Sequence, residues 1–319
     1  LIYQAAEAGA DAAKFQHFNA KTIVSKEGFE KFVDQKSHQS KWKKSVFEVY
    51  RNAEVNLSWT PTLKETCKKA GISFFTSPYS LELVDEVDPF VPAYKIGSGD
   101  ITWIEIIKHI ASKKKPYILA TGASTMEDVK RAVNAALKIN ENLALLQCNT
   151  NYTASLENFK FIQLNVLKKY AKLFPDLILG LSDHTPGHST VLGAVTLGAR
   201  IIEKHFTDNN NRIGPDHLFS MNPKSWSEMV LRTRELENSL GTGIKKVEDN
   251  EKETVIVQRR SLWLNKNISK GEIIKKDDID ILRPSTQDGI QPYNLNEIIG
   301  KKLNKNKKKG DNIKNNDFE

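Results

Sequence analysis

Short apolar runs rich in β-branched and aromatic residues recur along the chain, and amphipathic stretches separate them. Seven runs are present: "AAKFQHF" (12–18), "ISFFTSP" (72–78), "AYKIGSG" (93–99), "PYILATG" (116–122), "LALLQCN" (143–149), "LILGLSDH" (177–184) and "RIIEKHF" (200–206). Stretches between them, such as "TMEDVKRAVNAALKIN", carry apolar residues at the spacing of one helix face. Strands that alternate with helices predict a parallel sheet with right-handed crossovers.

Each run is mainly apolar in its first part and carries polar residues or glycine near its C-terminal end. That pattern is typical of a (β/α)8 TIM barrel, which carries its chemistry at the carboxyl ends of the strands. An open doubly wound sheet also binds ligands there. However, no G-x-G-x-x-G segment opens a helix, and the polar ends are spread over all the runs. We therefore predict an α/β fold of the TIM-barrel type.

A closed barrel of this type needs one strand more than the sequence shows. The chain begins with "LIYQAAEAGAD", which has the pattern of the last turns of a helix followed by a strand. We expect the first barrel strand to lie upstream of Leu1, which would make this chain an N-terminally shortened part of a longer protein. The alternative is a miscount by one strand.

The chain changes character after the last of these runs. Segment 222–243 predicts a helix closed by glycine, and the charged segment 244–258 predicts a linker. Residues 259–319 contain two similar segments, "SKGEIIKKDDI" (269–279) and "KKGDNIKNNDF" (308–318). A turn repeated in the same register predicts a small pseudo-symmetric β-rich domain. The expected division is a barrel domain over 1–243, a linker over 244–258 and a second domain over 259–319.

Composition narrows the class of protein. A hydrophobic content of 39% with 27% charged residues is typical of a globular chain. No apolar run reaches the roughly 20 residues of a membrane helix, and the first residues of this sequence show no signal-peptide pattern. With Cys67 and Cys148 as the only cysteines, a reducing cytoplasm is expected. The net charge of +8 lies mostly after residue 259, but no aromatic residues interleave with "KKLNKNKKKGDNIKNN", so no nucleic-acid partner is expected.

Two histidines end neighbouring strands of the expected barrel. Residues two apart in a strand point to the same face, so Ser182 shares a face with His184, and Glu203 with His205. Two imidazoles that converge at one mouth, near oxygen ligands, predict a site for a divalent metal. The alternative is a structural role for each ring. The histidines without such a partner are His17, His38 and His109.

Two lysines lie at strand ends where a barrel interior should be dry. Lys14 shares a face with Gln16, and Lys95 precedes a Gly-Ser-Gly turn. Buried lysines need anionic partners, so the pair would suit the phosphate and carboxylate of one small molecule, or else structural ion pairs. Asp216, in "GPDH", could bind a sugar hydroxyl or form a turn. Hydroxyls at the same height are offered by Ser77, Ser98 and Thr121.

Taken together, these segments resemble a known family. "GADAAKFQ", "YKIGSGD", "GLSDHT", "EKHFTD", "GPDH" and "SMNP", in this order, are similar to the sialic acid synthases. That family includes N-acetylneuraminate synthases and their legionaminic and pseudaminic acid relatives. The C-terminal part resembles the family's antifreeze-like (SAF) domain.

The resemblance implies a reaction. The family condenses phosphoenolpyruvate with an N-acylated hexosamine, giving a nine-carbon 2-keto acid and phosphate. We expect N-acetylmannosamine as the acceptor and N-acetylneuraminate as the product. The alternative is a legionaminic or pseudaminic acid synthase that uses a 2,4-diacetamido-trideoxyhexose. The expected cofactor is a divalent metal, most commonly Mn²⁺, with Mg²⁺ or Co²⁺ as alternatives.

The resemblance also implies roles for single residues. By matching segments, His184 and His205 fall on the metal ligands, while Lys14 and Lys95 fall on the lysines that hold phosphoenolpyruvate. Arg283 falls on an arginine that reaches the sugar's N-acyl group from a partner subunit, which implies a domain-exchanged homodimer. Glu203 is expected to act in catalysis. The residues expected to bind substrate, besides Arg283, are Gln16, Ser77, Ser98, Thr121, Tyr152, Ser182 and Asp216.

The chain also departs from the family pattern. The family's carboxylate lies in a segment like E-I-G-x-N-H, which this sequence does not contain, so activity is expected of the longer natural protein. "CNTNY" replaces Cys-Thr-Asn before the tyrosine, and Ala120 stands where some relatives have serine. A rival hypothesis is a catalytically silent sugar-phosphate binder. An ice-binding role for the C-terminal domain is disfavoured by its Lys-rich surface.

Overall fold

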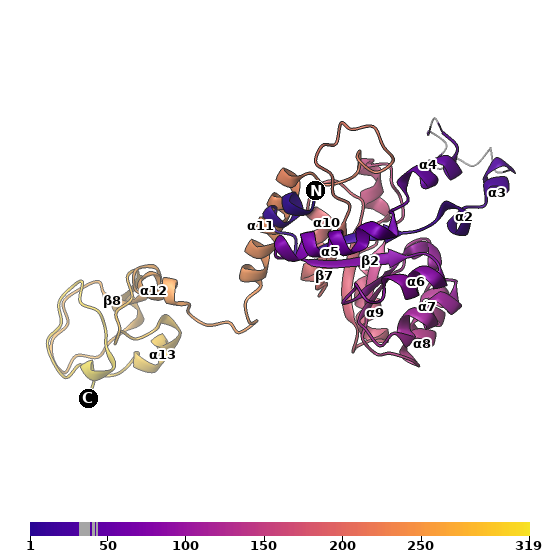
Figure 1. Ribbon diagram of the computed structural model, residues 1–319. Helices are drawn as coiled ribbons and strands as arrows, with labels where there is room; N and C mark the ends of the chain where they lie inside the picture. Colours follow the sequence, from indigo (N-terminus) through magenta and orange to yellow (C-terminus); the bar gives the residue numbers. More distant parts are fainter. Residues whose placement is uncertain (32–38, 40–41, 43) are drawn as a thin grey trace. The chain divides into compact units, whose positions relative to one another are not determined.

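The computed structural model describes residues 1–31, 39, 42 and 44–319, so His38 lies outside the described residues. The chain forms two compact units, Leu1–Gly241 and Thr242–Glu319, and each is described by itself (Figure 1). The expected division at 243 and 258 stays a prediction. Among the described residues, no helix has the length and apolar character that a bilayer crossing requires.

The N-terminal unit is built on a parallel sheet of seven strands, in the order in which they occur along the chain. Every neighbouring pair is parallel. This confirms the prediction of an α/β fold of the TIM-barrel type. The strands are β1 (Ala12–His17), β2 (Ser73–Pro78), β3 (Tyr94–Ile96), β4 (Tyr117–Ala120), β5 (Leu143–Cys148), β6 (Ile178–Asp183) and β7 (Ile201–Lys204).

Helices precede, connect and follow the strands, and several of them flank the sheet in Figure 1. They are α1 (Ile2–Glu7), α2 (Ala20–Ile23), α3 (Lys26–Lys31), α4 (Val46–Ala53), α5 (Thr60–Lys69), α6 (Leu81–Val87), α7 (Ile104–Ser112), α8 (Met126–Leu137), α9 (Val166–Leu173), α10 (Ser189–Thr196) and α11 (Pro223–Leu240). α8 begins where Thr125 and Asp128 form a capping box. α11 is preceded by its N-cap residue Asn222, has proline in its first turn, and is followed by Gly241, where φ is +57°.

Alternation along the strands produces two apolar layers. In β5, Leu143 and Leu145 join the large core between the sheet and the helices. Ala144, Leu146 and Cys148 belong to a second cluster with Ala120, on the opposite side of the sheet. The second layer lies on the inner side of the sheet, below the carboxyl ends of the strands. Side chains at those strand ends therefore pack on an apolar base.

The strands β1 and β7 are the two edges of this sheet, and no backbone pairing joins them among the described residues. Between them lies a pocket of about 590 Å³, also lined by α1 and α11. The eighth strand expected upstream of Leu1 stays a prediction. The pocket extends toward the carboxyl ends of both edge strands, where the candidate site lies.

The C-terminal unit contains an antiparallel pair, β8 (Ser261–Leu264) and β9 (Ile279–Leu282), and short helices α12 (Lys252–Gln258) and α13 (Leu295–Ile298). Part of the expected linker is therefore helical. The two similar segments adopt matching turns. Asp278 accepts a hydrogen bond from the backbone N of Lys275 at 3.0 Å, and Asp317 accepts one from that of Lys314 at 2.9 Å. Both carboxylates are buried, which supports the predicted pseudo-symmetry.

Candidate active site

Strand parity divides the ends of β6 and β7 into two faces. Ser182 pairs with Glu203 in the strand register, and the Ser182 hydroxyl donates to Glu203 Oε1 at 3.1 Å. His184 and His205 follow two residues later on the same face, with ring centroids 5.3 Å apart. The structure therefore brings together the two imidazoles that the sequence predicted to converge.

A hydrogen bond orients the ring of His184, and a carboxylate lies close to the ring of His205. His184 Nδ1 lies 2.9 Å from the backbone oxygen of Asn149, and His205 Nδ1 lies 3.4 Å from Asp216 Oδ2. Because a carbonyl oxygen can only accept, Nδ1 of His184 carries the proton and Nε2 keeps a lone pair. Burial, followed by the neighbouring His205, lowers the pKa of His184 to about 4. His184 is therefore neutral at physiological pH, the state in which imidazole binds a metal.

Aromatic rings enclose the two histidines. The Tyr152 ring lies 4.4 Å from that of His184, and the Phe219 ring lies 4.9 Å from that of His205. Tyr152 was expected at the site, whereas Phe219 was not. Phe219 lies in the irregular loop that follows β7. Its position in the sequence therefore did not predict that it would contact the strand ends. Its contact with both histidine rings limits their rotation.

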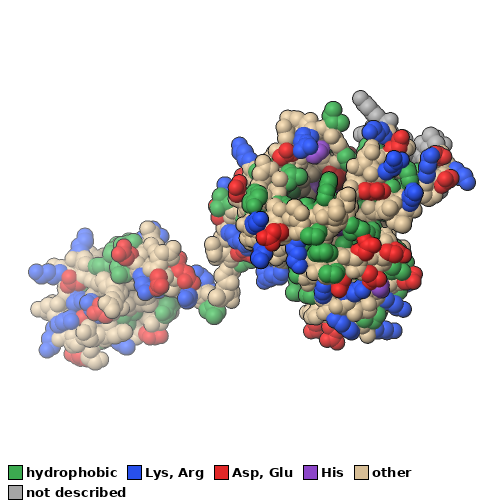
Figure 2. All heavy atoms as spheres, in the orientation of Figure 1, with side chains coloured by type: hydrophobic (Ala, Val, Ile, Leu, Met, Phe, Trp, Pro, Cys, Tyr) green, Lys and Arg blue, Asp and Glu red, His purple; other side chains and the backbone are tan. Residues whose placement is uncertain are grey.

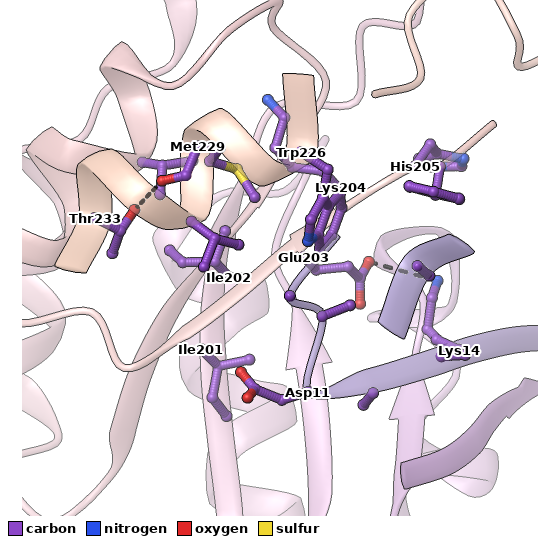
Figure 3. Close-up of a pocket in the computed structure, with 18 of the residues that line it drawn as sticks. Asp11, Lys14, Ile201, Ile202, Glu203, Lys204, His205, Trp226, Met229 and Thr233 are labelled. Atoms are coloured by element: carbon purple, nitrogen blue, oxygen red, sulfur yellow. Dashed lines mark hydrogen bonds and ion pairs between the residues drawn. The ribbon is translucent and has the colours of Figure 1, made fainter. Parts of the chain in front are cut away.

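Glu203 joins the two predicted lysines. Its Oε1 atom lies 3.5 Å from Lys14 Nζ and 3.7 Å from Lys95 Nζ, and Figure 3 shows Lys14 and Glu203 facing each other. Burial alone would raise the pKa of Glu203, but the two lysines outweigh it and hold the pKa at about 2. Lys95 is only 2% exposed, and this burial lowers its pKa. Two cations and one carboxylate leave a net positive charge that suits a small anion.

Polar groups from β1 and β2 lie beside this cluster. Gln16 and Ser77 are partners in the β1–β2 register, so their side chains share a face. The Ser77 hydroxyl is buried and has no hydrogen-bond partner among the described residues. Gln16 donates to the Tyr79 hydroxyl at 2.7 Å, and a Cβ on Gly97 would lie 2.9 Å from that hydroxyl. Tyr79 was missed by the sequence analysis, although it directly follows the polar end of β2.

Ser98 and Ser182 lie near a buried cysteine. The side chains of both serines act on the pKa of the Cys148 thiol, and the Ser98 hydroxyl accepts a hydrogen bond from the backbone N of Gly122 at 2.9 Å. Cys148 is buried, and burial raises the pKa of its thiol. It was treated only as evidence of a reducing compartment in the sequence analysis. Cys148 thus belongs to the apolar layer that lies beneath the two serines.

Thr121, which was expected at the site, points away from this cluster. The Thr121 hydroxyl donates to the backbone oxygen of Leu146 at 3.0 Å and accepts from Tyr170 at 2.9 Å, so both of its roles serve the interior. Arg283 lies on the C-terminal unit, where its side chain is exposed. His17 is bonded to Thr76 and Thr60 in the interior, as expected for a structural histidine.

The site is visible in Figure 2 as a hollow of the N-terminal unit, with histidine and acidic atoms within it. Among the residues that the structure describes, no three His, Cys, Asp or Glu side chains form a complete ligand cluster. Two imidazoles near the carboxylates of Glu203 and Asp216 do suit a borderline divalent ion. His184 and His205 thus fit a metal that takes its remaining ligands from elsewhere.

Comparison with known proteins identifies the family. The NeuB family profile matches residues 1–245, and the SAF domain profile matches residues 259–319. The chain is 36% identical to the N,N'-diacetyllegionaminic acid synthase of Legionella pneumophila, over 96% of this chain and 85% of that protein. It is 33% identical to a pseudaminic acid synthase of Campylobacter jejuni, over 100% and 91%.

A solved structure shows the same fold. The N-acetylneuraminic acid synthetase of Leptospira borgpetersenii matches 80% of this chain and 82% of its own, with a TM-score of 0.67 and 27% sequence identity. Members of the family use a divalent metal, phosphoenolpyruvate and an acetamido sugar, which agrees with the cluster of lysines and histidines. The chain therefore belongs to the NeuB family of phosphoenolpyruvate-dependent nonulosonic acid synthases and carries a C-terminal SAF domain.

Proposed function

We propose that this protein condenses phosphoenolpyruvate with a 2,4-diacetamido-2,4,6-trideoxyhexose to form a legionaminic- or pseudaminic-type acid. The observation that carries the reaction is the contact of Lys14 and Lys95 with one oxygen of Glu203, beside His184 and His205. The acceptor is inferred from identities of 36% and 33% to legionaminic and pseudaminic acid synthases, against 28% to the human N-acetylneuraminate-9-phosphate synthase. This replaces N-acetylmannosamine, the acceptor expected from the sequence.

The lysine cluster supplies the charge that phosphoenolpyruvate needs. The phosphate and carboxylate of phosphoenolpyruvate together carry more negative charge than Glu203 alone. Their binding would therefore balance the positive charges of both lysines. Lys95 is held at the site by a hydrogen bond from its Nζ to the backbone oxygen of Ile96 at 3.1 Å. The unpartnered Ser77 hydroxyl would donate to a ligand oxygen. We assign the hydroxyls of Ser98 and Ser182 to the phosphate, because both lie at strand ends beside the lysine cluster.

The chemistry proceeds by formation of one C–C bond. The C3 atom of phosphoenolpyruvate attacks the aldehyde carbon of the open-chain sugar, and positive charge develops at C2. Water adds to C2, and phosphate leaves together with its bridging oxygen. Glu203 keeps Lys14 and Lys95 oriented toward the site, and these cations are placed where they stabilise the negative charge that the phosphate carries away.

The two histidines are the proposed metal ligands. His184 and His205 would hold the divalent ion that family members use, and that ion supplies Lewis-acid polarisation of the aldehyde when bound. Asp216, at 3.4 Å from His205 Nδ1, orients that ring and is placed to accept a proton from a sugar hydroxyl. Tyr152 packs on His184 and would form one wall of the sugar site.

Arg283 completes the proposed acceptor site from the C-terminal unit. Its assignment to the N-acyl group, and the domain-exchanged homodimer that it implies, rest on the sequence resemblance. The exposure of Arg283 is compatible with contact to another subunit. Measurement of the oligomeric state by light scattering would test this part, and a monomer at enzyme concentrations used in assays would contradict it.

A competition experiment tests the proposed function. The natural protein would be given phosphoenolpyruvate, Mn²⁺ and equal concentrations of N-acetylmannosamine and 2,4-diacetamido-2,4,6-trideoxyhexoses, and the products would be identified by mass. We expect the nine-carbon diacetamido acid to predominate. Predominance of N-acetylneuraminate would overturn the acceptor assignment, and the absence of any condensed product would overturn the reaction itself.

A further inference from the structure

A buried ion pair lies on the face of β6 and β7 opposite to the candidate site. Asp183 and Lys204 are partners in the register of these strands, and the Nζ atom of Lys204 lies 2.5 Å from Asp183 Oδ2. Their side chains are 0% and 1% exposed. None of the roles proposed above uses this pair, although each member directly precedes one of the two histidines.

Further hydrogen bonds extend the pair to the segment after His184. Lys204 Nζ also donates to the backbone oxygen of Thr185 at 2.5 Å. Asp183 accepts from the Thr185 hydroxyl at 2.8 Å and from the Thr190 hydroxyl, on α10, at 2.7 Å. The residues on both sides of His184 are therefore tied to the residue that precedes His205.

These bonds matter more because of where β7 lies in the sheet. β7 is an edge of the sheet, and β6 is its only paired neighbour among the described residues. The backbone ladder sets the register of the two strands, and it ends with the pair of Asp183 and Lys204. Beyond this point, no strand pairing among the described residues joins His205 to His184, and the backbone oxygen of His205 accepts instead from Met221 N at 2.8 Å.

Stability alone is a weak explanation for such a pair. Removing two charges from water is costly, and well-packed neutral residues often stabilise a protein as much as a buried ion pair does. A buried pair is better accounted for where it fixes one geometry, as polar groups outside a metal's direct ligands do. Here the geometry is the spacing of two imidazoles on adjacent strands.

We propose that Asp183 and Lys204 are positioning residues that set the spacing of His184 and His205 for a divalent cation. The inference rests on the proposed metal site. Replacement of the pair should then weaken metal binding more than it weakens phosphoenolpyruvate binding, because Lys14 and Lys95 come from β1 and β3. A merely structural pair would affect both ligands through general loss of the folded state.

The test uses the double variant Asp183→Asn/Lys204→Met, which removes both charges together. Mn²⁺ is titrated into the protein, with free Mn²⁺ measured by electron paramagnetic resonance, and phosphoenolpyruvate binding is measured by calorimetry. We expect the Kd for Mn²⁺ to rise by about 10-fold or more, the typical effect of residues that orient metal ligands. The Kd for phosphoenolpyruvate should rise by a much smaller factor, because Lys14 and Lys95 stand on other strands. A wild-type Kd for Mn²⁺ in the folded double variant would overturn the inference.

If the double variant does not fold, a milder variant tests the positioning role of Asp183 and Lys204. Thr190→Val removes one donor to Asp183 and keeps both charges, so a smaller loss of Mn²⁺ affinity is expected, and an unchanged affinity would contradict the proposal. The matched control is Lys307→Met, which breaks a buried pair with Asp317 in the C-terminal unit. It should lower stability without changing Mn²⁺ affinity.

His184→Ala separates this inference from the proposed function. If His184→Ala binds Mn²⁺ as the wild type does, the proposed metal site is wrong and the positioning role falls with it. If His184→Ala loses Mn²⁺ while the double variant binds normally, only the positioning role is wrong.

Discussion

The Nζ atom of Lys95, whose side chain is only 2% exposed, lies 3.7 Å from Oε1 of Glu203. Lys14 approaches the same oxygen at 3.5 Å. A buried cation without a partner costs several kcal/mol, so this contact governs both the stability of the empty site and its affinity for an anion.

Glu203→Gln should therefore destabilise the protein in the absence of substrate. The variant leaves Lys95 buried without a counter-charge and beside Lys14, and we expect the free energy of unfolding to fall by roughly 3 kcal/mol. Phosphoenolpyruvate should restore more stability to the variant than to the wild type, because it supplies the missing negative charge. Thermal unfolding with and without phosphoenolpyruvate measures both effects.

The matched control for this prediction is Glu157→Gln. Glu157 is 78% exposed and pairs with Lys160 on the surface, and such pairs contribute about 0 to 1 kcal/mol. Equal destabilisation by the two variants would show that Glu203 has no special role in holding the lysines.

Lys95→Met should weaken phosphoenolpyruvate binding. A hydrogen bond to a charged group contributes about 1.5 to 3 kcal/mol, which corresponds to a roughly 10- to 100-fold rise in Kd. The variant itself should fold, since Glu203 keeps Lys14 as a partner. Calorimetric titration with phosphoenolpyruvate measures the change, with Lys160→Met as the control. A Kd equal to that of the wild type would remove Lys95 from the substrate site.

Asp100 predicts a pH dependence of stability. Burial raises the pKa of Asp100 to about 6, against the opposing attraction of Lys95. The folded protein then keeps a proton that the unfolded chain releases near its ordinary pKa of 3.8. The contribution of this group therefore falls as pH rises from about 4 to about 6, and the loss persists above that range.

Asp100→Asn should remove this loss. At pH 7 we expect the variant to be more stable than the wild type by roughly 2 to 3 kcal/mol, because one pKa unit corresponds to about 1.4 kcal/mol. The difference should shrink as the pH falls and vanish below about pH 4. Urea unfolding across this range provides the measurement, and a difference independent of pH would show that burial of the charge is not its cause.

The repeated aspartates predict a local effect in the C-terminal unit. Asp317 is 0% exposed and lies 2.7 Å from both Lys305 and Lys307. Asp317→Asn leaves Lys307, which is only 10% exposed, without its counter-charge. We expect a loss of roughly 3 to 5 kcal/mol, seen by calorimetry as a lower transition temperature of that unit alone. Asp288→Asn is the control and should change little, because the Asp288 side chain is 63% exposed.

The strands could be predicted because their local pattern is strong. Runs of β-branched and aromatic residues, bounded by glycine or polar residues, gave all seven strands in order. The convergence of the two histidines followed from strand parity, which depends only on the period of two, and the two lysines were recognised as cations at strand ends. Features of this kind can be predicted because they depend only on residues that are close together in the sequence.

Other parts of the site depend on long-range contacts that no local pattern reveals. Phe219 and Tyr79 reach the site from loops, and Cys148 was recognisable only once its strand neighbours were known. The orientation of Thr121 toward Tyr170 depends on the packing of α9 against the sheet. The helix in the expected linker was missed because its charged composition gave no amphipathic stripe.

The measurement that tests the central claim most directly is phosphate release from phosphoenolpyruvate by the natural protein with Mn²⁺ and a 2,4-diacetamido-2,4,6-trideoxyhexose. His184→Ala and, as its control, His188→Ala would be measured beside the wild type. We predict phosphate release that requires the sugar, is lost in His184→Ala and persists in His188→Ala. Metal binding without phosphate release for any acetamido sugar would contradict the account and favour a silent binder.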